Sequence, residues 1–595
     1  MSTVILTGLP VPGSPLEDEL RSLGFDVRPV PAPEDTAAAL AGVPAGERVA
    51  VVDAGFVGHA HALRLALTDP RFDACAVTGA FAVQAGARAA LERAAEPSPD
   101  GEGPYPDRLA AAVEAAGTAV QRPELGTLVA AVPSTGAERA EALAAVAAVD
   151  DEAVRLRTAV KSRDGFFTTF FISPYSRYIA RWCARRGLTP NQVTTASLLT
   201  ALIAAGCAAT GERWGYVTAG VLLLVSFVLD CTDGQLARYS LQYSTLGAWL
   251  DATFDRAKEY SFYAGLALGA ARNGDDVWAL ALGSMILMTC RHVVDFSFNE
   301  ANADAVATAA GKSVTGSPTA ALSTRLDSVG WTVWVRRMII LPIGERWAMI
   351  AVLTAATTPR TVFYALLIGC AFGALYTTAG RVLRSVTRKA ERTDRAARAL
   401  ADLADSGPLA GLVASHPLRT LRLPFAVLGA VVLVGAAWYE PYGSLMVVFA
   451  ALLYVLLSGD AVGAPLRGPL DWLLAPLFRA AEYTTVLLLA VKADVPGALP
   501  AAFGLVAAVA YHHYDTVYRI RGGSGAPPRW LVRTTGGHEG RVLLTAALAA
   551  VVARDAFPVA LTALAVFVAL VVLVESIRFW VSAGAPAVHD EGEPA

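Results

Sequence analysis

Residues 230–238 of the sequence, DCTDGQLAR, place two aspartates and an arginine at the end of a long apolar run. A charged side chain at bilayer depth costs about 2.5–3.5 kcal/mol on insertion scales, so charges in such a place indicate a functional site. Asp230 and Asp233 are three residues apart and share one face of a helix, as do Asp251 and Asp255, four residues apart, in the next apolar segment. The two faces can converge because a short polar loop joins the segments.

Four carboxylates in a low dielectric cannot all stay ionised unless cations balance them. Mg²⁺ and Mn²⁺ prefer oxygen ligands, four carboxylates suit two such ions, and paired ions of this kind clamp phosphoryl groups. The small residues Gly234, Ala237 and Gly247 leave room for a bulky ligand, and Arg238 offers a fork of N–H donors to a phosphate. The pattern therefore predicts two Mg²⁺ or Mn²⁺ ions and a bound diphosphate.

The spacing D-x2-D-G-x2-A-R-x8-G-x3-D-x3-D, from Asp230 to Asp255, resembles that of the CDP-alcohol phosphotransferase family without a departure. The resemblance covers about residues 161–390. It implies an enzyme that cleaves the pyrophosphate of a CDP-alcohol, usually CDP-diacylglycerol, releases CMP and transfers the phosphoryl-alcohol to an acceptor hydroxyl in phospholipid biosynthesis.

The resemblance also implies roles for individual residues. The metal ligands would be Asp230, Asp233, Asp251 and Asp255, and Asp255 would also be the catalytic base that takes the proton of the acceptor. The positions that match the CDP-alcohol site of the family are Asn191, Thr194, Gly234, Ala237, Arg238, Ser244 and Gly247. Independently of the resemblance, candidate ligands of an anionic acceptor or lipid headgroup are Lys161, Arg177, Arg291 and Arg337, with juxtamembrane anchoring as the alternative for each.

The composition is that of a polytopic membrane protein with a soluble part. Of the 595 residues 54% are hydrophobic and only 17% are charged, whereas a soluble protein carries about 25% charged residues. Twelve spans are expected, at about 191–209, 215–232, 246–271, 277–297, 346–358, 361–378, 423–438, 443–458, 481–494, 499–512, 541–553 and 557–574. The fold class expected is mainly α, with a six-helix bundle, a second bundle of about six helices and a soluble α/β domain at the N-terminus.

The domain plan follows from these segments. It comprises residues 1–150 (α/β, with TVILTGL, RVAVVDAG and ACAVTGA as strands), 151–190 (juxtamembrane, amphipathic), 191–390 (catalytic), 391–415 (basic, solvated linker helix), 416–582 (second membrane domain) and 583–595 (disordered tail). Arginines beside the first span place that face, the active site and both termini in the cytoplasm, by the rule that positive loops stay inside. No cleavable signal peptide, nucleic-acid partner or disulfide is expected, and the six cysteines are expected to be buried thiols.

The two membrane regions share sequence features that predict an internal duplication. DRAKEYSFYAGLAL (255–268) resembles FRAAEYTTVLLLAV (478–491), and GERWAMIAVLTAA (344–356) resembles EGRVLLTAALAA (539–550). Asp295 and Asp515 follow at similar spacing. Chance similarity among Ala/Leu-rich helices is the alternative.

Some features recur in the second copy and others do not. Arg256 and Glu259 recur as Arg479 and Glu482, which favours a structural ion pair, whereas Phe478 stands at the position of Asp255. The C-terminal half is therefore expected to be a degenerate copy without a metal site, so that the chain forms an internal pseudo-dimer, with a homodimer left open. A polar network is favoured over a metal site for the cluster of His512, His513 and Asp515.

The N-terminal domain resembles the nucleotidyltransferase domain that some family members carry. Its first strand leads into LPVPGSPLEDEL, which has no Lys or Arg, so the expected Gly-rich basic nucleotide loop is missing. We expect this domain to be degenerate and non-catalytic. A soluble donor such as CDP-inositol and a transporter of two six-span repeats remain alternatives, although a carboxylate quartet in one half only favours the enzyme. The acceptor could be inositol phosphate, glycerol phosphate, serine or another phospholipid.

Overall fold

The computed structural model describes residues 2–96, 101–161, 164–310, 341–387, 392–415 and 422–582. The predicted disordered tail at 583–595 therefore lies outside the described residues. The chain divides into two compact units, one of residues 1–162, 173–193 and 231–244, the other of residues 163–172, 194–230 and 245–595. The boundary crosses α10 (Arg213–Ser240), which is one continuous helix.

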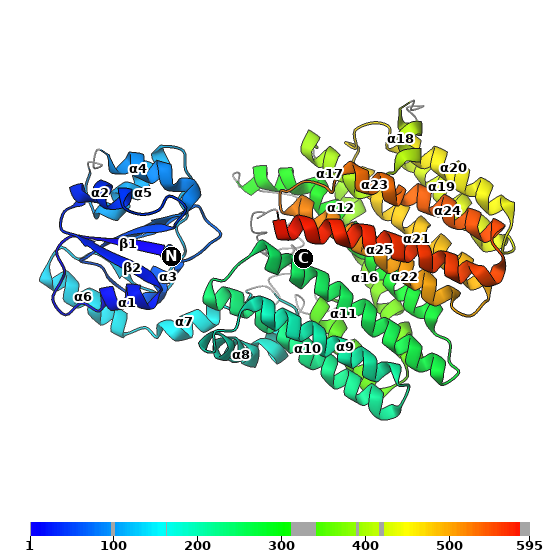
Figure 1. Ribbon diagram of the computed structural model, residues 1–595, viewed down its shortest axis with the longest axis horizontal. Helices are drawn as coiled ribbons and strands as arrows, with labels where there is room; N and C mark the ends of the chain where they lie inside the picture. Colours follow the sequence, from blue (N-terminus) through cyan, green and yellow to red (C-terminus); the bar gives the residue numbers. More distant parts are fainter. Residues whose placement is uncertain are drawn as a thin grey trace. The chain divides into compact units, whose positions relative to one another are not determined.

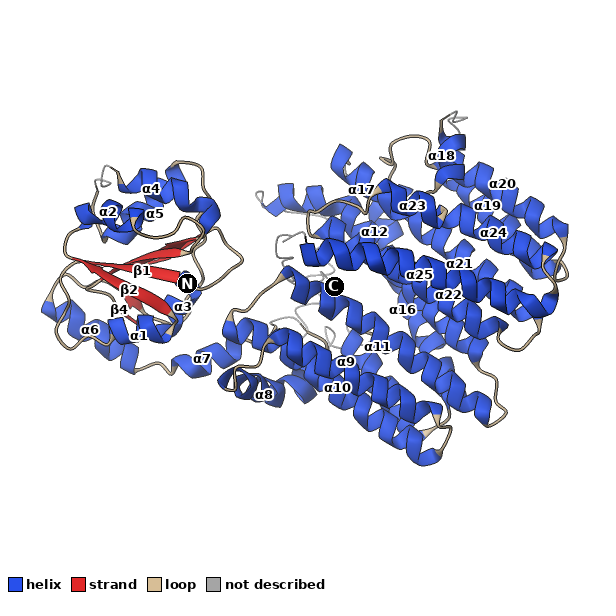
Figure 2. Ribbon diagram, viewed as in Figure 1, coloured by secondary structure: helices blue, strands red, loops and turns tan. Residues whose placement is uncertain are grey.

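The N-terminal part of the first unit is a three-layer α/β domain (Figures 1 and 2). Its strand order is β2-β1-β3-β6-β5, in which β1 pairs parallel with β2 and β3, and β6 pairs antiparallel with β3 and β5. The elements are β1 (Ser2–Thr7), α1 (Leu16–Ser22), β2 (Phe25–Val30), α2 (Thr36–Ala41), β3 (Val49–Asp53), β4 (Val57–Gly58), α3 (Ala60–Leu67), β5 (Ala74–Val77), β6 (Ala80–Val83), α4 (Arg88–Ala95), α5 (Tyr105–Ala115), β7 (Ala130–Ala131), α6 (Gly136–Ala147) and α7 (Asp151–Thr158).

Both faces of this sheet are covered, with α2, α4 and α5 on one side and α1, α3 and α6 on the other (Figure 2). Alternate residues of β1 serve the two cores: Ile5 packs with Leu109 of α5, and Val4 packs with Leu63 of α3. The three expected strands are confirmed as β1, β3 and β5.

The membrane part of the chain holds two sets of helices, one in each half. The first set is α8 (Ser173–Arg185), α9 (Pro190–Ala209), α10, α11 (Thr245–Arg272), α12 (Trp278–Ala310), α15 (Ile343–Ala356) and α16 (Pro359–Thr387). The second is α17 (Asp394–Ala404), α18 (Pro408–Ala414), α19 (Arg422–Tyr439), α20 (Leu445–Ala461), α21 (Leu474–Ala493), α22 (Ala498–Arg521), α23 (Arg529–Thr535), α24 (Gly537–Val551) and α25 (Phe557–Ser582).

Seven of the described helices are long and apolar enough to cross a membrane: α9, α10, α12, α16, α19, α21 and α25. The chain is therefore a polytopic helical membrane protein, as its composition predicts. The other expected spans are helices that are shorter or more polar. α15 and α24 have 14 and 15 residues, fewer than the roughly 20 that cross a bilayer, and α11 carries the charges of the site.

Residues 391–415 differ from the expected solvated linker helix. They contain α17 and α18, and α17 buries Leu400 and Leu403 as it packs against α12, α21 and α22. Asp405 ends α17 in a left-handed conformation with φ 52°, and its side chain enters the cluster described below. This segment is thus part of the membrane domain core.

An arginine–glutamate–arginine group recurs in the two halves. In the first half, Glu259 of α11 pairs with Arg256 at 3.1 Å and with Arg346 of α15 at 3.3 Å. In the second, Glu482 of α21 pairs with Arg479 at 2.6 Å and with Arg541 of α24 at 2.6 Å. The predicted structural ion pair is confirmed in both halves, and its glutamate also joins α11 to α15 in the first half and α21 to α24 in the second.

A second kind of contact recurs at the glutamates that precede Arg346 of α15 and Arg541 of α24. Glu345 accepts a hydrogen bond from the backbone N–H of Phe167 at 3.3 Å. Glu539 accepts hydrogen bonds from the N–H groups of Gly407 and Ala410 at 3.1 and 3.0 Å. Each glutamate therefore holds the segment that precedes the first long helix of its half.

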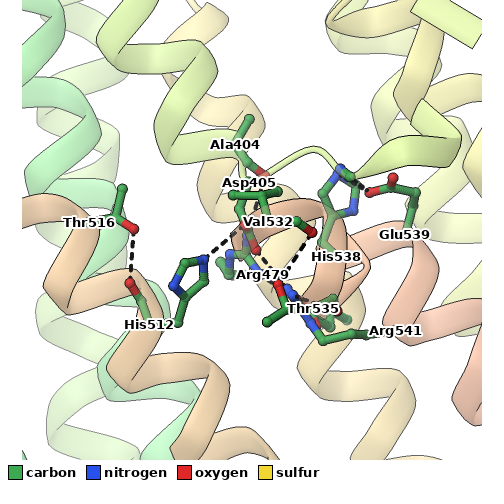
Figure 3. A network of polar contacts seen from close by, with 12 residues as sticks. Ala404, Asp405, Arg479, His512, Thr516, Val532, Thr535, His538, Glu539 and Arg541 are labelled. Carbon is green, nitrogen blue, oxygen red and sulfur yellow. Dashed lines mark hydrogen bonds and ion pairs between the residues drawn. The ribbon is translucent and has the colours of Figure 1, made fainter. Parts of the chain in front are cut away.

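In the second half, the buried cluster of Glu482, Arg479 and Arg541 contains an additional carboxylate, that of Asp405 (Figure 3). Its Oδ2 lies 2.8 Å from Arg479 and 2.7 Å from Arg541, and its Oδ1 lies 3.2 Å from Nε2 of His512. Two buried arginines thus face two buried carboxylates, Asp405 and Glu482, so the cluster is balanced without a metal ion.

Candidate active site

The four motif aspartates lie on α10 and α11, two consecutive helices joined by residues 241–244. The helices run in opposite directions, so Asp233 and Asp251 are nearer the loop than Asp230 and Asp255. One carboxylate oxygen from each of Asp230, Asp233 and Asp251 lies within 4.8 Å of the others. Among the described residues this is the one His/Cys/Asp/Glu group found with spacing suited to a metal ion. Three carboxylates fit a hard divalent cation such as Mg²⁺ or Mn²⁺.

Asp255 lies outside that group, and a lysine pairs with it. Nζ of Lys258 lies 3.3 Å from Oδ1 of Asp255 and also donates a hydrogen bond to Oδ1 of Asp230. The Lys258 side chain is 1% exposed. The sequence shows that Lys258 is near the motif, but not that its side chain turns into the site, so this contact was not predicted.

The end of α10 is held by the segment that precedes α9. Nε of Arg238 donates to the carbonyl oxygen of Ala159 at 2.6 Å. The guanidinium of Arg155 lies 3.6 Å from the ring centroid of Tyr239 and donates to the Tyr239 carbonyl at 2.8 Å. Arg238 is thereby oriented through its Nε. A Cβ on Gly234 would lie 3.5 Å from the two Nη atoms of Arg238, at van der Waals contact, so this glycine lies beside the guanidinium.

The other predicted ligands are found on the elements expected. Asn191 and Thr194 lie in the first turn of α9, and Gly247 lies in the first turn of α11. Ser244 lies in the loop before α11, and Ala237 lies one turn beyond Asp233 on α10. Their contacts with a CDP-alcohol stay predictions.

The candidate acceptor ligands are in different surroundings. Lys161 is exposed just after α7, Arg177 is half-buried on α8, and Arg291 is buried on α12. Arg337 lies outside the described residues. α8 exposes Tyr175, Tyr178 and Trp182 beside its arginines, which is typical of a helix at a membrane interface. Acceptor binding by these residues stays a prediction.

Of the predicted polar cluster, His512 and Asp515 make polar contacts with other helices, whereas Nε2 of His513 has no hydrogen-bond partner within the described part of the chain. His512 contacts Asp405. Oδ1 of Asp515 accepts hydrogen bonds from Ser576 and Trp580 at 2.7 Å each, and Oδ2 lies 2.9 Å from Nε of Arg519. The six cysteines are free thiols, of which Cys75, Cys183 and Cys370 are buried as predicted, whereas Cys207, Cys231 and Cys290 are half-buried.

The fold and site thus define a multi-pass membrane protein with an acidic group whose spacing suits a metal ion. Residues 187–358 match the family model described as CDP-alcohol phosphatidyltransferase, which confirms the family recognised from the motif for this region of the chain. Residues 394–595 match a separate family model, described as a family of unknown function (DUF5941).

Several curated proteins are similar over this region. An archaetidylinositol phosphate synthase of Pyrococcus horikoshii is 34% identical over 115 residues, which are 19% of this chain and 58% of that protein. A phosphatidylinositol phosphate synthase of Streptomyces avermitilis is 29% identical over 130 residues (21% and 51%). A bifunctional IPC transferase and DIPP synthase of Aquifex aeolicus is 30% identical over 136 residues (22% and 31%). The chain thus spans about a third to three fifths of the length of these relatives, whose names support a transferase of substituted phosphate groups.

Proposed function

We propose that the protein is a metal-dependent CDP-alcohol phosphotransferase that transfers a phosphatidyl group from CDP-diacylglycerol to an acceptor hydroxyl with release of CMP. The observation that carries this proposal is the convergence of Asp230, Asp233 and Asp251 to within 4.8 Å, in a region that matches the family model. A second copy of this group is not found among the described residues, which argues against a transporter with two equivalent sites.

Different residues of the chain have different roles in the proposed reaction. Asp230, Asp233 and Asp251 would hold the metal, which when bound neutralises the diphosphate and stabilises CMP as the leaving group. Arg238, which is held through its Nε by Ala159, is expected to donate to a phosphate. Asp255 takes the proton of the acceptor hydroxyl as general base. The nucleotide is expected to contact Asn191, Thr194, Gly234, Ala237, Ser244 and Gly247.

The names of the similar proteins favour an inositol phosphate as the acceptor. The Pyrococcus and Streptomyces proteins are both named as synthases of inositol phosphate lipids, and we propose the same class of acceptor for this chain. A soluble donor such as CDP-inositol is the second candidate, because the N-terminal domain resembles the nucleotidyltransferase domain that some family members carry. The site would face the cytoplasm, as would both termini, because arginines cluster beside the first span.

The experiment is CMP release by the purified protein in detergent with Mg²⁺ or Mn²⁺. CDP-diacylglycerol and CDP-inositol are compared as donors, each with inositol phosphate, glycerol phosphate, serine and a phospholipid as acceptors. We expect CMP from CDP-diacylglycerol with inositol phosphate, and none with EDTA. CMP formation from neither donor with any of these acceptors would contradict the proposal.

We also propose that the C-terminal half is a degenerate copy that serves as an internal partner of the first. Phe478, at the position of Asp255, stacks on His538 with a centroid distance of 4.2 Å, and Oη of Tyr454 lies 2.8 Å from Nδ1 of that histidine. These aromatic contacts at the position of Asp255 support a copy that has lost its metal site.

The second half also contacts the helices of the first. Trp249 of α11, two residues before Asp251, stacks on Trp580 of α25 with a centroid distance of 6.1 Å. The guanidinium of Arg256 lies 5.2 Å from the ring centroid of Tyr514 on α22. These contacts support a role for the C-terminal half in positioning α11.

The N-terminal domain is proposed to be non-catalytic. The chain continues from β1 to β2 on one side of the sheet, and from β3 toward β5 and β6 on the other. In such a fold, a ligand usually binds at the carboxyl ends of the two strands where the order reverses. Asp53, at the end of β3, instead accepts a hydrogen bond from the N–H of Gly55 at 2.8 Å, and Asp107 accepts one from Gly79 at 2.9 Å. Burial raises the pKa of both carboxyls. These acids thus support the local backbone.

A further inference from the structure

Lys258 is a buried cation placed on the same helix face as two motif aspartates. It follows Asp251 by seven residues and Asp255 by three on α11, so all three side chains project toward α10. The ammonium contacts one carboxylate on each helix, Asp230 and Asp255. Lysine can often extend its charge to water, but this side chain is only 1% exposed.

The neighbouring carboxylate of α11, that of Glu259, does not balance Lys258. Glu259, the neighbouring residue, is occupied by Arg256 and Arg346. An unpaired ammonium at this depth would be strongly unfavourable, and two carboxylates compensate its loss of hydration. Asp230 and Asp255 are therefore the partners that make a buried Lys258 tolerable.

The contacts divide the four motif aspartates into two levels. Nearer the loop, Asp233 and Asp251 converge with Asp230 as a group suited to a metal ion. Farther from the loop, Asp255 and the same Asp230 share the ammonium. The Lys258 ammonium, a monovalent cation, thus pairs with carboxylates that a second divalent ion would need as ligands.

We propose that the ammonium of Lys258 takes the place of one of the two divalent ions, so that this site holds a single ion among Asp230, Asp233 and Asp251. The inference rests on the proposed function, because it assumes that these aspartates bind a metal. It has a consequence for the reaction. Asp255 is held by an ammonium instead of by a metal ion, so it keeps the proton-accepting role without serving as a metal ligand.

The test counts bound ions on the full-length protein. Metal-free protein in detergent is titrated with Mn²⁺, and free Mn²⁺ is followed by electron paramagnetic resonance. We expect about one Mn²⁺ per chain for the natural protein and for Lys258→Arg, and about two for Lys258→Met, since four carboxylates without the ammonium can serve a paired-ion site. Lys492→Met, which removes a lysine of α21 that donates to backbone carbonyls, is the matched control and should bind about one ion, as the intact site does.

Two ions bound by the natural protein would overturn the inference, even if Lys258→Met fails to fold. So would a folded Lys258→Met protein that binds no additional ion. CMP release is measured on the same samples. An active natural protein with two ions contradicts the inference alone, whereas absence of both CMP release and Mn²⁺ binding contradicts the proposed function and the inference with it.

Discussion

Asp251 and Asp255 lie one helical turn apart, yet their surroundings assign them different roles. Asp251 belongs to the three-carboxylate group, whereas Asp255 pairs with Lys258. The motif alone places both as metal ligands. The structure separates them because Lys258, three residues after Asp255 on the same helix, pairs with Asp255.

Substitution should reveal this difference. Asp255→Asn removes the general base, and we expect turnover to fall roughly 10²–10⁴-fold while Mn²⁺ binding is retained. Asp251→Asn should lose Mn²⁺ binding as well as CMP release. Asp555→Asn changes an exposed carboxylate and should alter neither. Normal CMP release by Asp255→Asn would remove the assigned base.

The sequence predicts this site well at the level of residue type and helix face. Fixed spacing of eight positions selects the four aspartates and Arg238. It cannot predict Lys258, because a lysine one turn beyond Asp255 can turn toward the carboxylates or extend toward water. It also misses the contact of Arg238 with Ala159, since the two residues are 79 positions apart.

At the scale of elements, each half is stabilised by the same kind of ion pair between two of its helices. Glu259 of α11 pairs with Arg346 of α15, and Glu482 of α21 pairs with Arg541 of α24. The similar sequences around Arg256 and Arg479 predict the ion pair within α11 and the one within α21. Arg346, Arg541 and the preceding glutamates were not singled out, because their partners come from segments distant in the sequence. β2 is not predicted from the sequence for a different reason, because Arg28 and Pro29 interrupt its apolar pattern.

The cluster in the second half should be essential for stability. Arg541→Met leaves Asp405 and Glu482 with Arg479 as their remaining arginine partner, and breaking a buried pair costs about 3–5 kcal/mol. We expect a marked loss of thermal stability in detergent. The double variant Arg541→Met/Glu482→Gln should lose less than the sum of the single changes. Arg533→Met, at an exposed arginine of α23, is the control, and an equal effect of both arginine changes would contradict the role of the cluster.

The α3 helix of the N-terminal domain should respond to acid. His61 is buried, and burial, with the nearby Arg155, lowers its pKa from 6.5 to about 4. The unfolded chain therefore binds a proton between these values that the folded domain does not, so stability falls as the pH drops from 6.5 toward 4. Hydrogen exchange of α3 amides should accelerate over this range beyond the intrinsic change. His61→Leu should reduce this dependence, and an unchanged profile would contradict the assignment.

At the scale of the whole molecule, the C-terminal half packs on the first through α12 with α21 and α22, and through α11 with α22. Oη of Tyr514 lies 2.5 Å from Nδ1 of His292 across this packing. The internal-partner proposal predicts that the first half needs the second.

A chain of residues 1–400 should therefore be unstable or weakly active on its own, because α11 and α12 would lose the aromatic contacts of α22 and α25. Co-expression of residues 394–595 should restore CMP release. The full-length protein with Asp555→Asn serves as the reference. A stable 1–400 fragment with full activity would show that the second half has no required role.

The most direct test of the central claim is a structure of the full-length protein with Mn²⁺ and CDP-diacylglycerol, in which the ion is located by its anomalous scattering. The account predicts an ion bound by Asp230, Asp233 and Asp251, with the diphosphate beside it and Arg238 on a phosphate oxygen. Carboxylates that point apart, or an ion bound elsewhere in the chain, would contradict it.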